Sequence, residues 1–307
     1  MNSEIPSQPP RISVVIPTHN RPELLAKLIR SCMSQAQDVE ILVMDDASSP
    51  PTEEMVRRDF PQVIYAREEV SRGPVFQRNK GAMLARGEFL FTLDDDVIPA
   101  APGIFEQTLV DFDSPRVGAV AIPYCNVLQG PLIYHKSPQL IGTYITSNYY
   151  GGMIAFRRSA YLEAGGYQEF LFMHCEELEL ATRLYNLGYV IRIGRSAPLE
   201  HYESSVRNRV RLHTLGSRNY VLYCWYDIPS PYVWFRLPAL IIQTQYKALR
   251  RGHWWPSFLG VLKGFKGLFH EFNKRRPISR QAYRIVRSLR NSTRLMEELE
   301  PQLPPLR

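Results

Sequence analysis

Residues 89–96 read FLFTLDDD, a short, mostly apolar run that ends in three aspartates. Such a run is typical of a strand that is buried on both faces of a parallel sheet. In these sheets ligands bind at the carboxyl ends of the strands, so we expect the aspartates at a binding crevice. Two carboxylates spaced i, i+2 at a strand end can hold one hard divalent cation against a diphosphate. The structural alternative is an acidic turn that caps the following helix.

Alternating strand and helix patterns precede this stretch. The predicted strands are residues 12–16, 39–44 and 63–66, and the predicted helices are 23–33, 52–60 and 73–85. With the strand at 89–93 they give a βαβαβαβ order, which indicates a parallel sheet with helices on both faces. We expect the polar segments 17–21 and 45–48, which follow the first two strands, to meet the aspartates in one crevice. Each segment alone also fits an ordinary strand-to-helix turn.

The second hundred residues alternate less regularly and are expected to be mixed α and β. Strands are predicted at 117–123, 153–157 and 189–193, and a helix at 176–187. That helix begins with Glu176, Glu177 and Glu179, three carboxylates within four residues. Neighbouring carboxylates raise each other's pKa, which suits a general base. The helix dipole alone also favours acidic residues in a first turn, so a purely structural role is the alternative.

The composition is that of a globular protein, with 45% hydrophobic and 22% charged residues in a chain of 307. The four cysteines are scattered without a CxxC pair, which favours a reducing compartment over a zinc ribbon or a redox motif. The polar first residues lack the apolar core of a secretory signal, and no window offers 18 uninterrupted apolar residues. We therefore expect a cytoplasmic protein without a membrane-spanning helix.

Positive charge is concentrated in the last fifth of the chain. Residues 245–307 carry 14 Lys and Arg against four Asp and Glu, a net charge of +10, whereas residues 1–244 carry 23 against 26. All four tryptophans lie at or beyond position 225. A mildly acidic body with a basic, aromatic tail favours an anionic membrane surface as a partner. No nucleic acid partner is expected, because no recognisable binding module accompanies the charge.

Within this tail, residues 257–272 are expected to form an amphipathic helix. Its large apolar residues recur at helical spacing and are Phe258, Val261, Leu262, Phe265, Leu268, Phe269 and Phe272. Together with the nearby basic residues, this pattern indicates a helix that lies in a membrane interface. A helix that packs its apolar face on the rest of the chain is the alternative.

Seven motifs follow one another in a fixed order. They are VVIPTHNRPELL at 14–25, DDAS at 45–48, RNKG at 78–81, LDDD at 93–96, GG at 151–152 with RRS at 157–159, GGY at 165–167, and EELELATR at 176–183. Over residues 11–205 this order resembles family 2 of the nucleotide-sugar glycosyltransferases. The resemblance implies the GT-A fold, an α/β architecture that is Rossmann-like, with a mostly parallel sheet and helices on both faces. The basic, aromatic residues that follow would form a helical C-terminal extension.

The resemblance also implies roles for individual residues. Asp46 would contact the nucleobase. The nucleoside and diphosphate would be surrounded by Pro17, Thr18, Asn20, Arg21, Arg78, Asp94 and Asp95. Asp94 and Asp96 would form the motif for Mn²⁺ or Mg²⁺, with Asp96 as the direct ligand. His201 would complete the metal coordination.

The general-base position falls on Glu177. The family usually has Asp there and at the position of Glu179, so this sequence departs from the pattern at both positions. The base therefore stays open between Glu177 and Glu176.

The implied reaction is a single displacement with inversion at the anomeric carbon. The donor would be a nucleoside-diphosphate sugar, with UDP- and dTDP-sugars both fitting, and the acceptor a hydroxyl of a glycan or a lipid-linked acceptor in cell-surface polysaccharide synthesis. A non-processive, bacterial-type enzyme is implied, because the spanning helices and QxxRW motif of the processive synthases are lacking. One alternative is a sugar nucleotidyltransferase, although residues 17–25 lack its glycine-rich loop. Another is a non-catalytic nucleotide- or glycan-binding protein on the same scaffold.

These patterns divide the chain into four parts. We expect a disordered tail at 1–10, a GT-A catalytic domain at 11–211, a helical extension at 212–296 and a flexible tail at 297–307. The extension would hold the protein peripherally on the inner face of the cell membrane.

Overall fold

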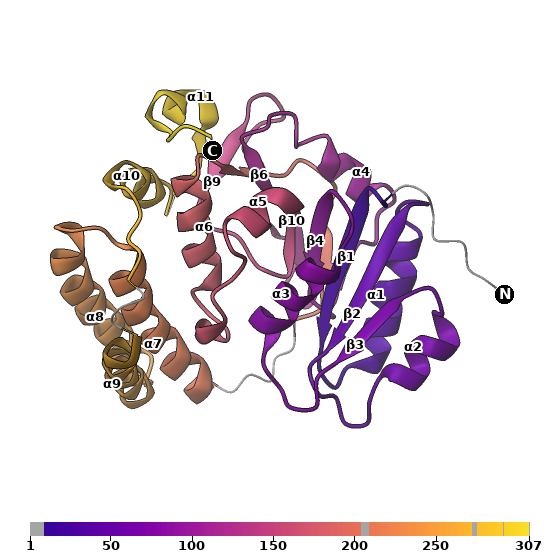
Figure 1. Cartoon of the computed structure of the whole chain (residues 1–307), viewed down its shortest axis with the longest axis horizontal. Helices are drawn as coiled ribbons and strands as arrows, with labels where there is room; N and C mark the ends of the chain where they lie inside the picture. Colours follow the sequence, from indigo (N-terminus) through magenta and orange to yellow (C-terminus); the bar gives the residue numbers. More distant parts are fainter. Residues whose placement is uncertain (1–8, 204–208, 272–274, 291, 307) are drawn as a thin grey trace.

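The computed structural model describes residues 9–203, 209–271, 275–290 and 292–306, so residues 1–8 of the expected N-terminal tail lie outside the described part. A nine-stranded sheet has the order β13-β9-β11-β6-β10-β4-β1-β2-β3, and a four-stranded sheet has the order β5-β12-β7-β8 (Figure 1). None of the helices in the described ranges combines the length and apolar character that a bilayer-spanning segment requires.

The first part of the chain forms the parallel half of the larger sheet. It contains β1 (Ile12–Thr18), α1 (Pro22–Met33), β2 (Val39–Asp45), α2 (Glu53–Asp59), β3 (Ile64–Arg67), α3 (Pro74–Leu84) and β4 (Phe89–Leu93). β1 pairs in parallel with β2 and β4, and β2 pairs in parallel with β3. The predicted order of strands and helices is confirmed, with each end within two residues of its predicted position.

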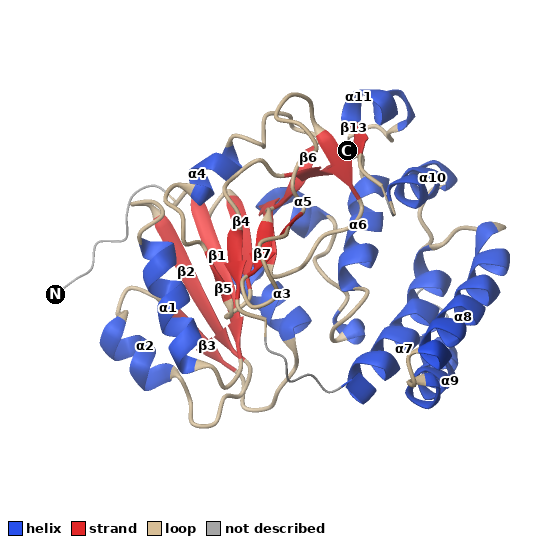
Figure 2. Cartoon of the chain, turned by 180° about the vertical axis from the view of Figure 1, so that it is seen from behind, coloured by secondary structure: helices blue, strands red, loops and turns tan. Residues whose placement is uncertain are grey.

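The direction in which strands are added reverses between β1 and β4. After β1 the sheet grows through β2 to β3, and α3 then carries the chain back to β4 on the other side of β1. α3 crosses in front of the sheet in Figure 1, whereas α1 lies over the face seen in Figure 2. Such a reversal leaves a crevice at the carboxyl ends of the two strands. α3 lies so close to β1 that a Cβ at position 81 would overlap Val15, so glycine at this position permits the close approach.

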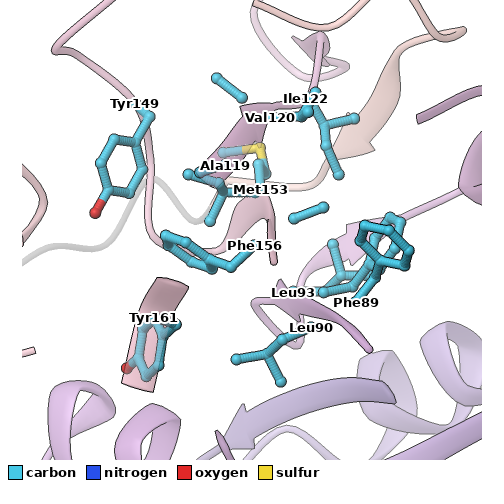
Figure 3. Close-up of a cluster of buried hydrophobic side chains, with 14 of the residues drawn as sticks. Phe89, Leu90, Leu93, Ala119, Val120, Ile122, Tyr149, Met153, Phe156 and Tyr161 are labelled. Carbon is cyan, nitrogen blue, oxygen red and sulfur yellow. The ribbon is translucent and has the colours of Figure 1, made fainter. Parts of the chain in front are cut away.

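The middle of the chain extends the same sheet in mixed directions. It contributes α4 (Ile104–Leu109), β6 (Val117–Ala121), β9 (Tyr144–Thr146), β10 (Met153–Arg157), α5 (Arg158–Glu163), a 3-10 helix (Glu169–Leu171), α6 (Glu176–Asn186) and β11 (Val190–Ile193). β10 runs antiparallel to β4 and β6, so the sheet is parallel only in its first half and in the β6–β11 pair. The core between these strands includes Phe89, Val120 and Phe156, with Tyr149 and Tyr161 beside them (Figure 3).

The smaller sheet was not predicted. Its strands are β5 (Val97–Ile98), β7 (Tyr124–Asn126), β8 (Ile133–Tyr134) and β12 (Leu199–His201). Strands of two or three residues are too short to show an alternating pattern, so their sequence carries no strand signal. β12 pairs with β5 in antiparallel register, which places His201 opposite Val97 and next to the end of β4.

The C-terminal region is helical, as expected, but it is not one separate unit. α7 (Arg209–Asp227), α8 (Tyr232–Arg250) and α9 (Trp254–Glu271) lie side by side at one end of the molecule (Figure 1). α10 (Arg280–Leu289), β13 (Arg294–Leu295) and α11 (Met296–Leu299) then return to the sheet. β13 pairs with β9, and Ile285, Val286 and Leu289 of α10 join the main hydrophobic core. The last part of the predicted extension is therefore built into the larger sheet and the main hydrophobic core.

The described residues 297–306 do not form the flexible tail that we expected. Leu299 and Leu303 are buried in the main core, on either side of a 3-10 helix (Glu300–Gln302). Arg116 donates a hydrogen bond to the carbonyl of Pro304 at 3.0 Å. Isolated leucines among Pro and Glu show no periodicity, so only tertiary packing fixes this segment.

α9 divides the large apolar residues of the predicted face between the interior and the surface. Small residues turn toward α7: a Cβ on Gly260 would meet the carbonyl of Thr214, and one on Gly264 would meet Val221. Several large side chains remain exposed instead, among them Leu262, Phe265 and Phe269. Phe272, the last member of the predicted face, lies outside the described residues. The helix therefore packs on α7 through glycines together with Val261 and Leu268, and a row of large apolar side chains is left on its outer face.

Candidate active site

A cavity of about 700 Å³ opens at the carboxyl ends of β1, β2 and β4. Its lining contains Pro17, Thr18, Arg21, Asp46, Arg78, Asp94, Asp95, Asp96, Glu176, Glu177 and His201. The structure therefore brings together every predicted site residue except Asn20. The reversal of strand order explains this position, because it leaves the ends of β1 and β4 uncovered.

Asn20 holds the loop after β1 and does not line the cavity. Its backbone N–H donates to Oγ of Ser48 at 2.9 Å, and its side-chain oxygen accepts from the backbone N–H of Ser49 at 2.7 Å. Its φ of +59° is left-handed, a conformation that Asn tolerates better than most residues. Asn20 thus joins the loop after β1 to the loop after β2.

The three aspartates after β4 face different groups. Asp94 accepts from Nη2 of Arg78 at 2.6 Å. Asp95 and Asp96 both accept from Nη1 of Arg21, at 2.9 and 2.7 Å. The two arginines thereby separate three adjacent negative charges.

The surroundings of Asp95 and Asp96 shift their pKa values in opposite directions. Burial raises the pKa of Asp95 to about 6, although the charge of Arg21 and a hydrogen bond from Thr18 at 2.9 Å both oppose this. Burial would also raise the pKa of Asp96, but neighbouring His201 and Arg21 lower it below its ordinary value. Asp96 is therefore the better anion of the two at neutral pH.

His201 reaches Asp96 through the pairing of β12 with β5. Its Nε2 lies 3.5 Å from Oδ1 of Asp96, and its Nδ1 lies 2.6 Å from Oδ1 of Asn126. The amide nitrogen of Asn126 donates to Gln129 at 3.3 Å, so its oxygen faces the ring and places the proton on Nδ1. Nε2 then faces Asp96: with a second proton on the ring it donates to the carboxylate and lowers the pKa of Asp96, and in the neutral ring its lone pair is free to bind a cation placed between the two. An imidazole nitrogen and a carboxylate oxygen, both common ligands of divalent metals, face one another here.

This pair fits an open metal site rather than a closed one. Across the described ranges, no group of three or more His, Cys, Asp or Glu side chains is arranged to hold a metal ion. A cation that also binds the phosphates of a ligand needs only one or two protein ligands. Asp96 and His201 meet that requirement, and Asp94, which pairs with Arg78 through Oδ1 alone, keeps its second carboxylate oxygen available beside them.

Asp46 lines the cavity, but its carboxylate is already engaged. It accepts hydrogen bonds from Oγ of Ser71 at 2.6 Å, from the backbone N–H groups of Arg72 at 2.8 Å and Gly73 at 3.0 Å, and from Nε2 of Gln77 at 2.7 Å. Burial alone would raise the pKa of Asp46, but these hydrogen bonds lower it. The carboxylate fixes the start of α3, and a nucleobase would have to share its oxygens with these donors.

Two consecutive glycines allow the buried charges to pack. A Cβ on Gly151 would lie 2.9 Å from Nη1 of Arg78, and one on Gly152 would overlap the carboxylate of Asp94. The backbone N–H of Asp94 also donates to the carbonyl of Gly152 at 3.1 Å. The Arg78–Asp94 ion pair can therefore form only with glycine at positions 151 and 152.

Glu176 and Glu177 begin α6 at the rim of the cavity and have different surroundings. Glu176 is 3% exposed, and its Oε1 lies 3.7 Å from Nη1 of Arg78. Glu177 accepts from the backbone N–H of Gly151 at 3.4 Å and lines a second cavity as well. Burial raises the pKa of both carboxyls, and the charge of Glu177 raises that of Glu176 further.

Glu179 has a structural role. Its carboxylate pairs with Arg183 one turn later, and Arg183 also donates to the carbonyls of Ala164 and Gly166. This arrangement anchors the GGY turn at 165–167 against α6. Glu179 is therefore unavailable as a base.

The loop before α6 is held by the C-terminal region. Nδ2 of Asn219, a buried residue of α7, lies 2.7–2.8 Å from the carbonyl oxygens of Leu171, Met173 and His174. Sequence reasoning missed this residue, because a lone Asn inside a helical pattern gives no signal. It also missed Asn126, which lies on a strand too short to predict.

Replacing Gly152 with Ala should weaken metal-dependent nucleotide binding, because the added Cβ displaces the carboxylate of Asp94, which lines the cavity beside Asp95 and Asp96. We would measure the thermal shift produced by nucleoside diphosphates with Mn²⁺. Gly216→Ala is the matched control, since nothing lies within 4 Å of its added Cβ. A folded Gly152→Ala protein that still shows the full nucleotide shift would contradict this role.

Comparisons with known proteins agree with this geometry. The family model described as Glycosyl transferase family 2 matches residues 13–165. Over 92 residues the chain is 40% identical to the GalNAc(5)-diNAcBac-PP-undecaprenol beta-1,3-glucosyltransferase of Campylobacter jejuni, covering 28% of this chain and 30% of that protein. Over 178 residues it is 28% identical to the glucosyl-dolichyl phosphate glucuronosyltransferase of Haloferax volcanii, covering 51% and 56%. The chain thus matches 30% and 56% of the length of these two relatives.

Solved structures show the same fold. The mannosyltransferase PcManGT from Pyrobaculum calidifontis, in complex with GDP-Man and Mn²⁺, aligns with a TM-score of 0.58 at 18% identity over 92% of this chain and 80% of that one. TarS 1-349 from S. aureus with UDP-GlcNAc aligns with a TM-score of 0.56 at 16% identity over 74% and 70%. The family match, the ordered motifs and the GT-A architecture agree, and the chain belongs to glycosyl transferase family 2.

Proposed function

We propose that this chain is an inverting, metal-dependent glycosyltransferase. It would move a sugar from a nucleoside-diphosphate sugar to a hydroxyl of a glycan or lipid-linked acceptor in cell-surface polysaccharide synthesis. The observation that carries the proposal is the cavity in which Asp96 and His201 face one another and Glu177 lies at the rim. The two relatives named above act, by their names, on lipid-linked sugars, which supports the acceptor class.

The residues of the cavity would have different roles toward the metal, the donor phosphates and the framework of the site. Asp96 and His201 would hold Mn²⁺ or Mg²⁺, which when bound supplies positive charge to a diphosphate leaving group. Arg21 lies against Asp96 and is partly exposed, so it is placed to contact the phosphates once the donor is present. Arg78 is fully buried and paired, so it holds Asp94 and Glu176 in place rather than reaching the ligand.

We assign the general base to Glu177. Its carboxylate would take the proton of the acceptor hydroxyl as that oxygen bonds to the anomeric carbon. The bond from the anomeric carbon to the diphosphate breaks on the opposite face, and the nucleoside diphosphate leaves with the electron pair. Burial raises the pKa of Glu177, which makes it a stronger base than a solvated carboxylate. Glu176 fits less well because it is more deeply buried and faces Arg78.

A thermal-shift panel with UDP, dTDP, GDP and CMP tests the donor and the metal together, each with Mn²⁺, Mg²⁺ or EDTA. Ligands that bind the native state stabilise it, by about 2.7 kcal/mol at a hundredfold excess over Kd. We expect one nucleotide to raise the midpoint only with metal, and Asp96→Ala and His201→Ala to lose that shift. Asp59→Ala is the control, because Asp59 lies on α2 outside the cavity lining and pairs with exposed Arg58. No shift with any nucleotide would contradict the proposal.

Glu177→Gln should lower kcat by about 10²–10⁴-fold while nucleotide binding stays unchanged, since only the proton acceptor is removed. Burial raises the pKa of Glu177 above its ordinary 4.5, and the carboxylate is the active form. The rate should therefore fall as pH drops, along an acidic limb that lies above pH 4.5. Glu298→Gln, an exposed change on α11, should leave the rate and the limb unaltered. Normal turnover by the Glu177→Gln protein would indicate that Glu176, and not Glu177, is the base.

We further propose that the outer face of α8 and α9 binds an anionic membrane surface. Large side chains are exposed there, including Phe235 and Ile242 on α8 and Trp255 and Phe269 on α9, of which Phe269 is 86% exposed. Exposed cations lie among them, on Arg250, Arg251, Lys263 and Lys266. Aromatic side chains enter the acyl boundary while basic side chains contact anionic headgroups.

Vesicle sedimentation of the full chain tests this surface. We expect binding to phosphatidylglycerol-containing vesicles but not to phosphatidylcholine vesicles. Phe269→Glu should weaken that binding at least about tenfold, because it removes a large apolar contact and adds a like charge. Val110→Glu is the control, since Val110 is 66% exposed beside α4 at the other end of the molecule (Figure 1). Equal sedimentation of the three proteins would contradict the surface.

A further inference from the structure

A second cavity of about 610 Å³ adjoins the first across Glu177. Glu177 and Tyr150 line both cavities, whereas the aspartates after β4 line only the first. The far walls of the second cavity come from α7, α8 and the end of α10, where Tyr220, Arg236 and Arg290 lie. If the donor occupies the first cavity, the second is where a group on the acceptor side would lie.

Three cations line this second cavity. Arg236 and Lys247 come from α8, and Arg290 comes from the C-terminal end of α10. Within the described ranges none of the three forms a salt bridge, and Arg290 lies over the ring of Tyr220 at 5.9 Å. The lining contains one carboxyl, that of Glu177, which is shared with the first cavity. The second cavity therefore has excess positive charge in a partly enclosed space.

The three cations converge from separate elements. Arg236, Gln243 and Lys247 are spaced i, i+7, i+11, so they share one face of α8. Arg290 reaches the same cavity from α10, which packs on α6. Guanidinium groups match the geometry of phosphate oxygens, and charge-assisted hydrogen bonds to them are about twice as strong as neutral ones. A neutral sugar would leave these charges without a counter-ion.

We infer that the second cavity is an acceptor subsite that binds a phosphoryl or diphosphate group through Arg236, Lys247 and Arg290. The inference rests on the proposed function and adds to it the chemical class of the acceptor. The acceptor hydroxyl would lie near Glu177, and the phosphoryl group would lie deeper in the second cavity. The three cations fix the position of the acceptor and take no part in the proton transfer.

The phosphoryl group could belong to a soluble glycosyl phosphate or to a lipid. Beside the cavity-lining row of α8 lies a row of exposed apolar residues, Phe235, Ile242 and Tyr246. Each of them directly precedes a residue of the lining row in the sequence, namely Arg236, Gln243 and Lys247. An amphiphile could place its phosphates on the cationic row and its chain along the apolar row. The two sources share the headgroup chemistry and differ in the apolar contact.

Binding of inorganic pyrophosphate, farnesyl diphosphate and farnesol to the full chain tests the subsite. The measurement is titration calorimetry with Mn²⁺ and a saturating concentration of the nucleotide selected by the thermal-shift panel, so that the first cavity is filled. We expect the two diphosphates to bind and farnesol not to bind. Arg236→Gln and Arg290→Gln should each weaken diphosphate binding by about tenfold or more. Lys247→Gln should weaken it less, because Lys247 is exposed.

Arg287→Gln is the matched control, because it removes the same charge from α10, one turn before Arg290, at an exposed position outside the cavity lining. Equal weakening by Arg287→Gln and Arg290→Gln would overturn the subsite, as would absence of diphosphate binding. Should an arginine variant unfold, the exposed Lys247→Gln still tests the charge. Similar affinities for pyrophosphate and farnesyl diphosphate support a subsite that contacts the phosphates alone. A preference for farnesyl diphosphate supports a subsite that also contacts the chain of a lipid acceptor.

The two proposals fail in distinguishable ways. If the donor proposal fails, no nucleotide raises the thermal midpoint of the protein. The diphosphate titration is then run without nucleotide, and the affinities of the same variants are compared. Failure of the subsite appears as normal nucleotide binding with diphosphate affinity that does not depend on Arg236 or Arg290.

Discussion

Three adjacent carboxylates at the end of a buried strand repel one another, and the arrangement of the site separates them. Asp94 is paired with Arg78, while Arg21 bridges Asp95 and Asp96. Each ion pair imposes a further requirement on the fold. The Arg78 pair needs two glycines so that β10 can approach, and the Arg21 pair needs the ends of β1 and β4 to be neighbours. The reversal of strand order satisfies the second requirement.

The C-terminal helices contribute to the two cavities and to the loop beside them, and do not form a separate extension. α7 holds the loop before α6 through Asn219, and so supports the start of the helix that carries Glu177. α8 and α10 supply the cations of the second cavity. The chain then returns to the larger sheet through β13 and to the main core through Leu303. The first cavity is thus lined by the ends of β1, β2 and β4 together with His201 and the start of α6, and the second cavity by the middle of the chain and by α7, α8 and α10.

Sequence patterns predicted those parts of the fold that have a clear period. β1, β2, β4 and β10 are long enough to show buried apolar runs, and α1, α3 and α6 show a helical period. The strands of the smaller sheet and the packed tail after residue 296 gave no pattern, because their elements are too short. The exposed apolar row of α9 was predicted as a set of residues. The division of the predicted set was not, because Val261 and Leu268 pack on α7 beside glycines that count as neither apolar nor polar.

The sequence alone indicated which residues gather at one cavity, with the exception of Asn20, because the carboxyl ends of parallel strands meet at one edge of the sheet. It could not determine which of those residues face a ligand and which hold the framework. Asp46, Asn20 and Glu179 carry motif positions, yet each is saturated by hydrogen bonds or an ion pair to neighbouring loops and helices. The contact between Asp96 and His201 follows from one pairing of short strands, and the placement of Glu177 between two cavities follows from how α6 meets α7 and α8. Those relations join residues far apart in the chain, so only tertiary packing decides them.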